Sequence, residues 1–202
     1  MTEKKQGGAE SLAASLGAAL LLLAVAISGG YYLWSEFRTF ETELHLRLGA
    51  IARVKAAAVA TWRKERIGDA YTTATAVFLM PSAQKVLEGT ANATDRTRVT
   101  AWLETVRDKY NYEDVTLTGL EGDVLISVGP VTPNAAMLKE CTEQAFLKSG
   151  TPDFGDFTTG GKDGEPRINV SLELREPGGR RLGALVLGID PEHEIYPSLR
   201  QW

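Results

Sequence analysis

The sequence has little of the chemistry that enzymes and metal sites use. Its 202 residues include one cysteine, which excludes an intramolecular disulfide and leaves no cysteine spacing that would indicate a metal site. The two histidines, His45 and His193, are far apart in the chain, and there is no phosphate loop or nucleophile elbow. We therefore expect no catalysis by this chain, and we assign it no metal and no cofactor.

A net positive charge is also missing. The formal charge at pH 7 is −4, so no basic surface indicates nucleic acid as a partner. The single Cys141 has no histidine near it in sequence that would activate it, and a small packed side chain is the expected role. The chain length leaves room for one ordinary domain beside an anchor.

Charged residues are absent from the whole of residues 12–34. A helix of that length, at about 1.5 Å per residue, crosses a hydrocarbon core of roughly 30 Å. Tyr31, Tyr32 and Trp34 place aromatic rings at one end of the run, as is typical of a membrane interface. We therefore predict a transmembrane helix over residues 12–34.

A cleaved signal peptide is the alternative to this anchor, because Ala24-Val25-Ala26 nominally fits a cleavage site. The apolar run continues past Ala26 into the aromatic end, which favours an uncleaved anchor. Lys4 and Lys5 make residues 1–11 the predicted cytoplasmic tail. The rest of the chain is then periplasmic or extracellular, and the protein is a single-pass protein of the bacterial inner membrane.

Residues 35–88 contain no proline before Pro81, which predicts a long stalk helix followed by one short helix. Apolar residues recur along the stalk at steps of three and four, from Phe37 to Trp62. Such a stripe either packs on the domain's own sheet or forms a seam between two chains. The near end emerges before any core is available, so we expect a homodimer there, and the far end near Trp62 is expected to pack on the sheet.

Residues 89–202 change from helical to strand periodicity. A helix over 95–110 is expected to begin at Asp95 as its N-cap, and a hairpin follows over 114–128. Thr132-Pro133 is typical of a helix start, and that helix is expected to run to Lys148. Three strands, about 154–158, 167–176 and 181–190, complete the domain. The order predicts an α+β fold in which one five-stranded antiparallel sheet, with its core at about 112–190, carries flanking helices.

Three stretches of this pattern carry a resemblance to a known family. They are the helix RVKAAAVATWRKERIGDA (53–70), the hairpin VTLTGLEGDVLISVG (115–129) and the exit LGALVLGIDPEHEIYP (182–197). Together they resemble a Cache-type sensor module, the extracytoplasmic relative of the PAS fold. The resemblance implies sensing of a small molecule, often a carboxylate or amino acid, for signal transduction through a histidine kinase of a two-component system, a cyclase or a chemoreceptor. Because the chain shows no second span or output domain, a fragment of a longer receptor is expected.

The resemblance also implies where a ligand binds, on the sheet face opposite the long helix and under the segment 130–157. Polar residues expected on that side are Tyr112, Asp156, Arg167, Asn169 and Ser171. Arg167 is suited to a two-pronged hydrogen bond with a carboxylate, and Asp156 is suited to accept from an amine. The alternative is that the polar face of strand 167–176 simply meets water.

A different class of function also stays open at this point. An anchored module that binds a protein partner or dimerises, with no small ligand, predicts a closed core and an exposed apolar patch. A sensor predicts a cavity with convergent polar groups on the far face of the sheet.

Overall fold

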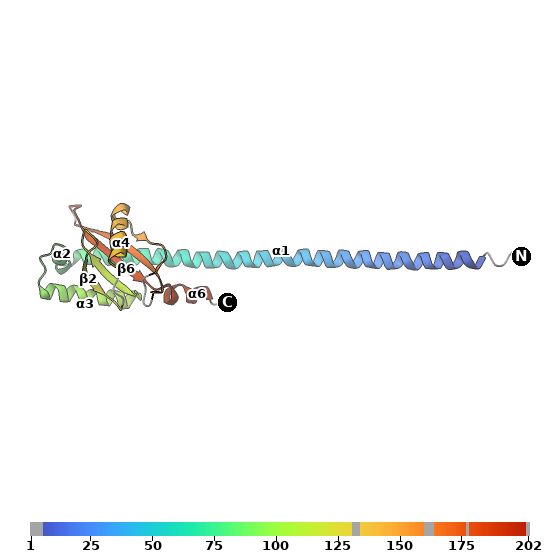
Figure 1. Ribbon diagram of the computed structural model, residues 1–202, viewed down its shortest axis with the longest axis horizontal. Helices are drawn as coiled ribbons and strands as arrows, with labels where there is room; N and C mark the ends of the chain where they lie inside the picture. The colour runs from blue at the N-terminus through green and yellow to red at the C-terminus, as the bar shows by residue number, and fades with distance from the viewer. Residues whose placement is uncertain (1–5, 131–133, 160–163, 177, 201–202) are drawn as a thin grey trace. The chain divides into compact units, whose positions relative to one another are not determined.

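The structure is a computed structural model that describes residues 6–130, 134–159, 164–176 and 178–200. The chain divides into two units, Met1–Lys55 and Ala56–Trp202. Helix α1, Gln6–Leu79, supplies the described secondary structure of the first unit and continues into the second (Figure 1). The remaining elements all belong to the second unit.

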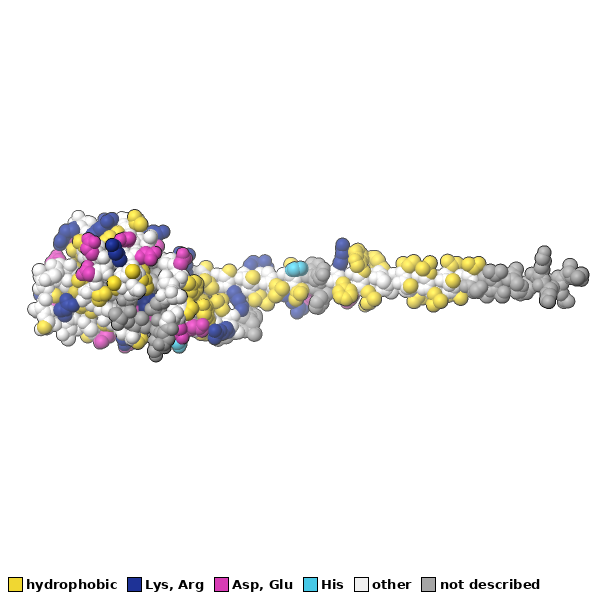
Figure 2. All heavy atoms as spheres, in the orientation of Figure 1, with side chains coloured by type: hydrophobic (Ala, Val, Ile, Leu, Met, Phe, Trp, Pro, Cys, Tyr) yellow, Lys and Arg dark blue, Asp and Glu magenta, His cyan; other side chains and the backbone are white. Residues whose placement is uncertain are grey.

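The first unit carries apolar side chains on its surface. Leu21, Leu22 and Ile27 are 68%, 71% and 64% exposed, and Figure 2 shows hydrophobic side chains along this part of the helix. Among the described residues, this is the one helix that is long and apolar enough to cross a membrane by length and composition. The predicted span at 12–34 lies within it. Exposed apolar surface of this extent is typical of protein or membrane interaction sites.

Two short-range signals shape the helices that follow α1. Pro81 occupies the first turn of α2, Pro81–Leu87, because a helix start does not use the amide that proline lacks. Helix α3, Ala93–Tyr110, begins earlier than predicted. Its N-cap is Asn92, whose side chain accepts from the Asp95 amide at 2.9 Å, so the prediction of Asp95 as the cap was wrong.

Asp95 instead completes the capping box and ties α3 to α2. Its carboxylate accepts hydrogen bonds from the Asn92 backbone amide at 3.5 Å and from the Ser82 hydroxyl at 2.8 Å. Lys85 forms an ion pair with it at 3.2 Å. Hydrogen bonds to the carboxylate hold the pKa of Asp95 below its ordinary value, with the Ser82 bond the largest cause.

In the part of the chain that the structure describes, six strands form the sheet, with the order β2-β1-β6-β5-β3 and with β4 paired on β5. Every pairing is antiparallel. The strands are β1 Asp114–Thr118, β2 Val124–Val128, β3 Asp153–Phe154, β4 Thr158–Thr159, β5 Pro166–Arg175 and β6 Arg181–Ile189. Helix α4, Ala135–Lys148, joins β2 at one edge to β3 at the other. Helices α5, Pro191–Glu194, and α6, Tyr196–Arg200, follow β6.

This arrangement confirms the predicted α+β fold and corrects two of its details. Helix α4 has Asn134 as its N-cap, with the side chain accepting from the Ala136 amide at 2.8 Å. The predicted start at Thr132-Pro133 lies outside the described residues. The strand predicted over 154–158 is two strands of two residues each, so the sheet has six strands rather than five.

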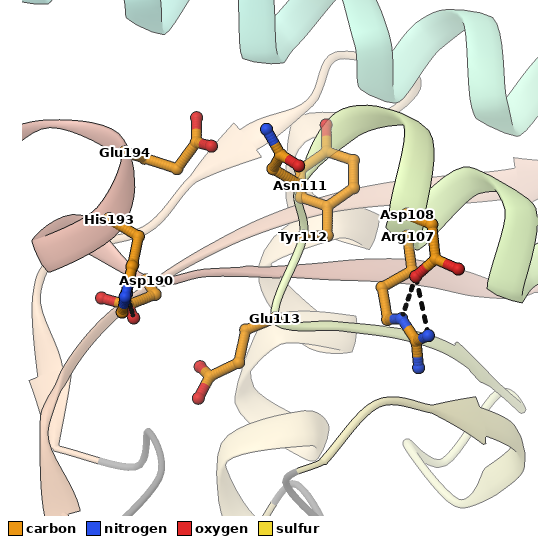
Figure 3. A pocket seen from close by; sticks show the side chains of 8 residues that line it. All are labelled: Arg107, Asp108, Asn111, Tyr112, Glu113, Asp190, His193 and Glu194. Carbon is orange, nitrogen blue, oxygen red and sulfur yellow. Dashed lines mark hydrogen bonds and ion pairs between the residues drawn. The ribbon is translucent and has the colours of Figure 1, made fainter.

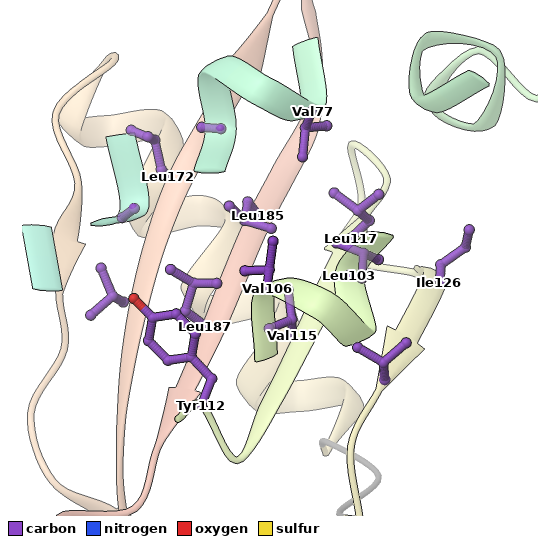
Figure 4. Packing of buried hydrophobic residues seen from close by; sticks show 14 of the residues in the cluster. Val77, Leu103, Val106, Tyr112, Val115, Leu117, Ile126, Leu172, Leu185 and Leu187 are labelled. Atoms are coloured by element: carbon purple, nitrogen blue, oxygen red, sulfur yellow. The ribbon is translucent and has the colours of Figure 1, made fainter. Parts of the chain in front are cut away.

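The apolar core lies between one face of the sheet and the helices α1 and α3. Alternate residues of the central strands supply it, including Leu117 of β1 and the pair Leu185 and Leu187 of β6. Val77 of α1 and Leu103 of α3 pack against them, as Figure 4 shows. The far end of the stalk therefore packs on the domain's own sheet, as predicted for the residues near Trp62.

The opposite face of the sheet is polar but buried. Arg167, Asn169, Ser171 and Glu173 point to this face from β5, and their exposed fractions run from 0% to 5%. The alternative that this face meets water is therefore wrong. Helix α4 covers it, and the hydroxyl groups of Thr142 on α4 and Thr118 on β1 lie 2.9 Å apart.

The hairpin turn also contacts this covering helix. Gly122 has φ +82, and a Cβ atom there would lie 2.6 Å from the Cα of Lys139. Only glycine combines that backbone conformation with so close an approach. The turn between β1 and β2 thus helps to hold α4 over the polar face.

Candidate functional site

A pocket of about 330 Å³ opens between α4 and the segment that joins β3 to β4. Its volume lies at the small end of the range for ligand sites, roughly 300–1,000 Å³. Helix α4 lines one wall and the β3–β4 segment lines the other, with one residue of β5 between them. The lining residues are Met137, Glu140, Cys141, Gln144, Asp153, Phe154, Gly155, Asp156, Thr158 and Asn169.

The β3–β4 wall is shaped by a bulge. The Gly155 amide donates to the Asn169 carbonyl at 2.8 Å, which continues the β3 register, whereas Thr158 pairs with Arg167. Two residues, 156 and 157, therefore lie opposite the single residue 168 of β5. Bulges bend a strand and re-aim its side chains, often beside functional sites. Here the bulge places Asp156 at the pocket.

Behind the pocket lies a buried ionic cluster on β1 and β5. The Arg167 guanidinium, which is 0% exposed, forms an ion pair with Asp114, which is also 0% exposed. It forms a second with Glu113 at 3.5 Å. Its Nε donates to the Asn169 side-chain oxygen at 2.7 Å. The cluster therefore connects directly to Asn169, a residue that lines the pocket.

Gly188 of β6 makes this cluster possible. It pairs with Asp114 on one side and with Asn169 on the other. A Cβ atom at this position would lie 1.9 Å from Nη2 of Arg167 and 2.4 Å from Asp114. Because Gly188 has no side chain, there is space for the Arg167 guanidinium to reach from β5 over β6 to Asp114 on β1.

Burial shifts the protonation of two groups near the pocket. The pKa of Asp114 is raised to about 6, because desolvation outweighs the attraction of Arg167. The pKa of Cys141 is raised to about 11, again chiefly by burial, so its thiol stays protonated at neutral pH. This protonation state agrees with the predicted role of Cys141 as a packed side chain.

The charges that line the pocket are all negative among the residues that the structure describes. Glu140, Asp153 and Asp156 contribute carboxylates. Lys148 approaches Asp153 at 3.9 Å, with its own side chain 54% exposed. Within the same described ranges, no group of three or more His, Cys, Asp or Glu side chains is arranged to hold a metal ion.

The five predicted site residues divide among four places. Asp156 and Asn169 line the pocket, and Arg167 lies behind it in the ionic cluster. Ser171 is 2% exposed and pairs with Asp153 in the sheet. Tyr112 lies elsewhere, at the end of α3. The structure thus brings together four of the five on one face of the sheet.

Sequence reasoning placed the site under residues 130–157, which include α4, but named no residue of this helix as lining it. Met137, Glu140, Cys141 and Gln144 share one helical face through their spacing of three and four residues, which is the signal that was available. That spacing shows that the residues share a face, but not what the face covers. The structure shows which of these side chains face the pocket, because α4 lies over the sheet as it crosses between the two edges.

A second, more open hollow of about 530 Å³ lies beside the C-terminal end of β6, and Tyr112 lines it. Figure 3 shows Asp190, His193 and Glu194 on one side of it and the end of α3 on the other. Asp190 raises the pKa of His193 through a hydrogen bond, and the Arg66 guanidinium lies over the Tyr112 ring at 5.6 Å. Arg66 also forms an ion pair with Glu194 at 3.1 Å, which fastens α5 to α1.

No protein-family model and no curated protein sequence matches this chain. Solved structures do match it. The ligand-binding domain of the Campylobacter jejuni chemoreceptor Tlp3, in complex with 4-methylisoleucine, is 16% identical with a TM-score of 0.58, covering 70% of this chain and 56% of that one. The ligand-binding domain of the Pseudomonas aeruginosa PAO1 amino-acid chemoreceptor PctC, in complex with GABA, is 15% identical with a TM-score of 0.53, covering 72% and 63%.

The sensor domain of the V. cholerae histidine kinase DctB is a third match, 12% identical with a TM-score of 0.53, covering 74% of this chain and 58% of that one. At these identities the likeness establishes the fold. This chain has the fold of the sensor domains of chemoreceptors and histidine kinases, as the resemblance to Cache-type, PAS-like modules predicted. It spans between half and two thirds of the length of these three domains.

Proposed function

We propose that this chain is a membrane-anchored, extracytoplasmic sensor module that binds a small molecule in the α4 pocket for transmembrane signalling. The observation that carries the proposal is a cavity with convergent polar groups on the sheet face opposite α1. A protein-interaction module without a ligand predicts a closed core at that place. The pocket therefore supports the sensor over its rival.

The structural neighbours support the same class of function. Tlp3 and PctC were solved with 4-methylisoleucine and GABA bound, and DctB is a histidine kinase. These are ligand-binding and sensor domains, which supports a role other than catalysis. In this proposal the chain is part of a longer receptor with an output domain, and the partial coverage of the neighbours agrees with that.

The proposed topology follows from the charge and length of the N-terminal segments. Residues 1–11 form a cytoplasmic tail, 12–34 span the inner membrane, 35–88 form the stalk and the short helix after it, and 89–202 form the sensor domain. The stalk pairs with that of a second copy to form a homodimer, and the domain lies in the periplasm or outside the cell. The single candidate span among the described residues supports this arrangement.

Contacts of the pocket wall suggest how binding reaches α1. Phe154 is one of the residues that line the pocket, and its ring packs edge-on against Trp62 of α1 with ring centroids 5.4 Å apart. Arg63 lies over the same ring at 5.0 Å. A ligand that draws the β3–β4 segment towards α4 would pull on these contacts. Helix α1 also contains the candidate span, so the movement would enter the membrane-facing part of the chain.

In the proposed site, Asp156 and Asn169 contact the ligand, Arg167 supports Asn169, and Ser171 lies next to them on β5. Tyr112 lines the second hollow and is a candidate for a separate role.

A thermal denaturation screen of the full chain in lipid nanodiscs tests the function. The panel contains amines, amino acids, organic acids and dicarboxylates. A ligand present at 100 times its Kd stabilises a protein by about 2.7 kcal/mol, which corresponds to a Tm rise of roughly 5–10 °C for a unit of this size.

The control variants make the screen specific to the pocket. The stabilisation is expected to disappear in Asp156→Ala and to persist in Glu121→Gln, which alters an exposed acidic residue in the hairpin turn. If no compound in the panel stabilises the protein, that result would count against the sensor and in favour of the interaction module. Stabilisation that persists unchanged in Asp156→Ala would move the site away from the α4 pocket.

A further inference from the structure

The orientation of the Asn169 amide is determined by its neighbour. A guanidinium group only donates hydrogen bonds, so the Asn169 atom that Arg167 Nε approaches at 2.7 Å must be the carbonyl oxygen. The reverse orientation would place an NH₂ group against a donor. The two N–H bonds of Asn169 are therefore directed away from Arg167, towards the side chains that surround the pocket.

The acceptors that these N–H bonds now meet are weak. One is the thioether sulfur of Met137 at 3.3 Å, and the other is the Thr158 hydroxyl at 3.5 Å, the outer limit of a hydrogen bond. A ligand oxygen at about 2.9 Å would form a stronger bond than either. Asn169 is 3% exposed, so this donor is well shielded from competing water.

The Arg167 charge is not offered to a ligand. The guanidinium is fully buried and is held between the carboxylates of Asp114 and Glu113. The pocket itself carries the carboxylates of Glu140, Asp153 and Asp156 and, among its described lining residues, no cation. A ligand carboxylate would therefore enter a negative field, whereas an amine would be attracted to it.

These observations define the chemistry of the ligand more narrowly than the proposed function, on which this step rests. We propose that the α4 pocket takes a small organic cation that also carries a neutral hydrogen-bond acceptor, such as an amino amide. The cationic amine pairs with Asp156 and Glu140, and the neutral oxygen accepts from Asn169. Arg167 is a positioning residue, because it holds the amide of Asn169 in the donating orientation.

Matched probe sets test this assignment on the full chain in nanodiscs. Four amino amides serve as probes: L-alaninamide, L-valinamide, L-leucinamide and L-phenylalaninamide. Each is compared, by calorimetric titration at pH 7, with the amino acid, the simple amine and the carboxylic acid of the same carbon skeleton. In every set that binds, the expected order of affinity is amino amide, then amine, then amino acid, with at least about tenfold between amide and amino acid and no binding of the acid.

Variants assign the two contacts separately. Asp156→Asn should weaken all cationic probes by about tenfold, with Glu121→Gln as the control for removing a negative charge elsewhere. In Asn169→Asp, the new carboxylate still pairs with Arg167, but the NH₂ group that donates to the ligand is lost. This variant should bring the affinity ratio of amino amide to amine close to one while the amine still binds, whereas Glu121→Gln should leave that ratio unchanged.

The positioning role of Arg167 has its own signature. Arg167→Lys should lower the same amide-to-amine ratio with Asn169 intact, because a single ammonium group does not hold the amide as the guanidinium does. A loss that is equal for all probes would mean that Arg167 acts on stability alone and would overturn its positioning role.

The outcomes separate this inference from the proposed function. Amino acids or carboxylic acids that bind more tightly than the amino amides would overturn the ligand class and leave the sensor function standing. No binding by any probe would overturn the ligand class, and the absence of any ligand in the broad thermal screen would overturn the function as well. An unchanged amide-to-amine ratio in Asn169→Asp would overturn the role given to Asn169.

Discussion

The buried carboxyl group of Asp114 makes the stability of the folded unit depend on pH in a direction opposite to that of most acidic residues. Its pKa is raised from the ordinary 3.8 to about 6, because burial penalises the charged form more than Arg167 favours it. Between these two values, the folded state binds more protons than the unfolded state. The contribution of Asp114 to stability is therefore complete below about pH 3.8 and is lost as the pH rises through 6.

The size of the effect follows from the two pKa values. At about 1.4 kcal/mol for each pH unit of separation, the free energy of unfolding should fall by about 3 kcal/mol over this range on account of Asp114 alone. Replacement by asparagine removes the titration. The difference in unfolding free energy between wild type and Asp114→Asn should therefore shift by about 2.4 kcal/mol, against the wild type, from about pH 4 to about pH 7.

Urea unfolding of the full chain in a non-ionic detergent, followed by tryptophan fluorescence, measures this difference. Asp108→Asn is the matched control, because the Asp108 side chain is 67% exposed on α3. Carbon-13 NMR of the aspartate carboxyl groups provides a second measurement on the wild type, with one signal expected to titrate near pH 6. Parallel stability curves for wild type and Asp114→Asn, with no such signal, would refute the reasoning.

Three further substitutions test the packing. Gly188→Ala places a Cβ atom against the Arg167 guanidinium and should cost about 3 kcal/mol or more of unfolding free energy. Gly178→Ala, with nothing within 4 Å of the added Cβ, should change stability by less than about 0.5 kcal/mol. Similar losses for the two variants in urea unfolding would contradict the close approach of Arg167 to Gly188. Asn92→Ala should cost about 1 kcal/mol by the same assay, and an unchanged midpoint would show that the cap is dispensable. Gly68→Ala, inside α1 with nothing within 4 Å, should add up to about 1 kcal/mol, and a lower Tm in thermal denaturation would be the contrary result.

Local patterns in the sequence were sufficient to predict most elements of the fold. The alternation of Val124, Ile126 and Val128 predicted a strand, and the chain forms β2 there. The helix predicted to end at Lys148 does so. Errors occurred where two local signals compete. Asn92 and Asp95 are both good caps, and the backbone geometry of Asn92 decides between them.

The bulge between β3 and β4 was a different kind of error. Residues 154–158 read as one short strand, because residue types alone do not reveal a register shift. The shift is set by pairing with β5, which is distant in sequence: Phe154 pairs with Val170, whereas Thr158 pairs with Arg167. Since the bulge aims Asp156 at the pocket, the missed register also hid the shape of the candidate site.

The sequence by itself determined the apolar helix, the order of elements and the two faces of each strand, because these depend on residues that are neighbours in the chain. Only the tertiary structure decided that the polar face of β5 is buried, because α4 must cross from β2 to β3 and lies over that face on the way. The same packing turned Arg167 from a candidate ligand-binding residue into the buried support of Asn169. The sequence gives the charge and polarity of each side chain. Whether a charged side chain is available to a ligand depends on whether a neighbour in the folded structure already pairs with it.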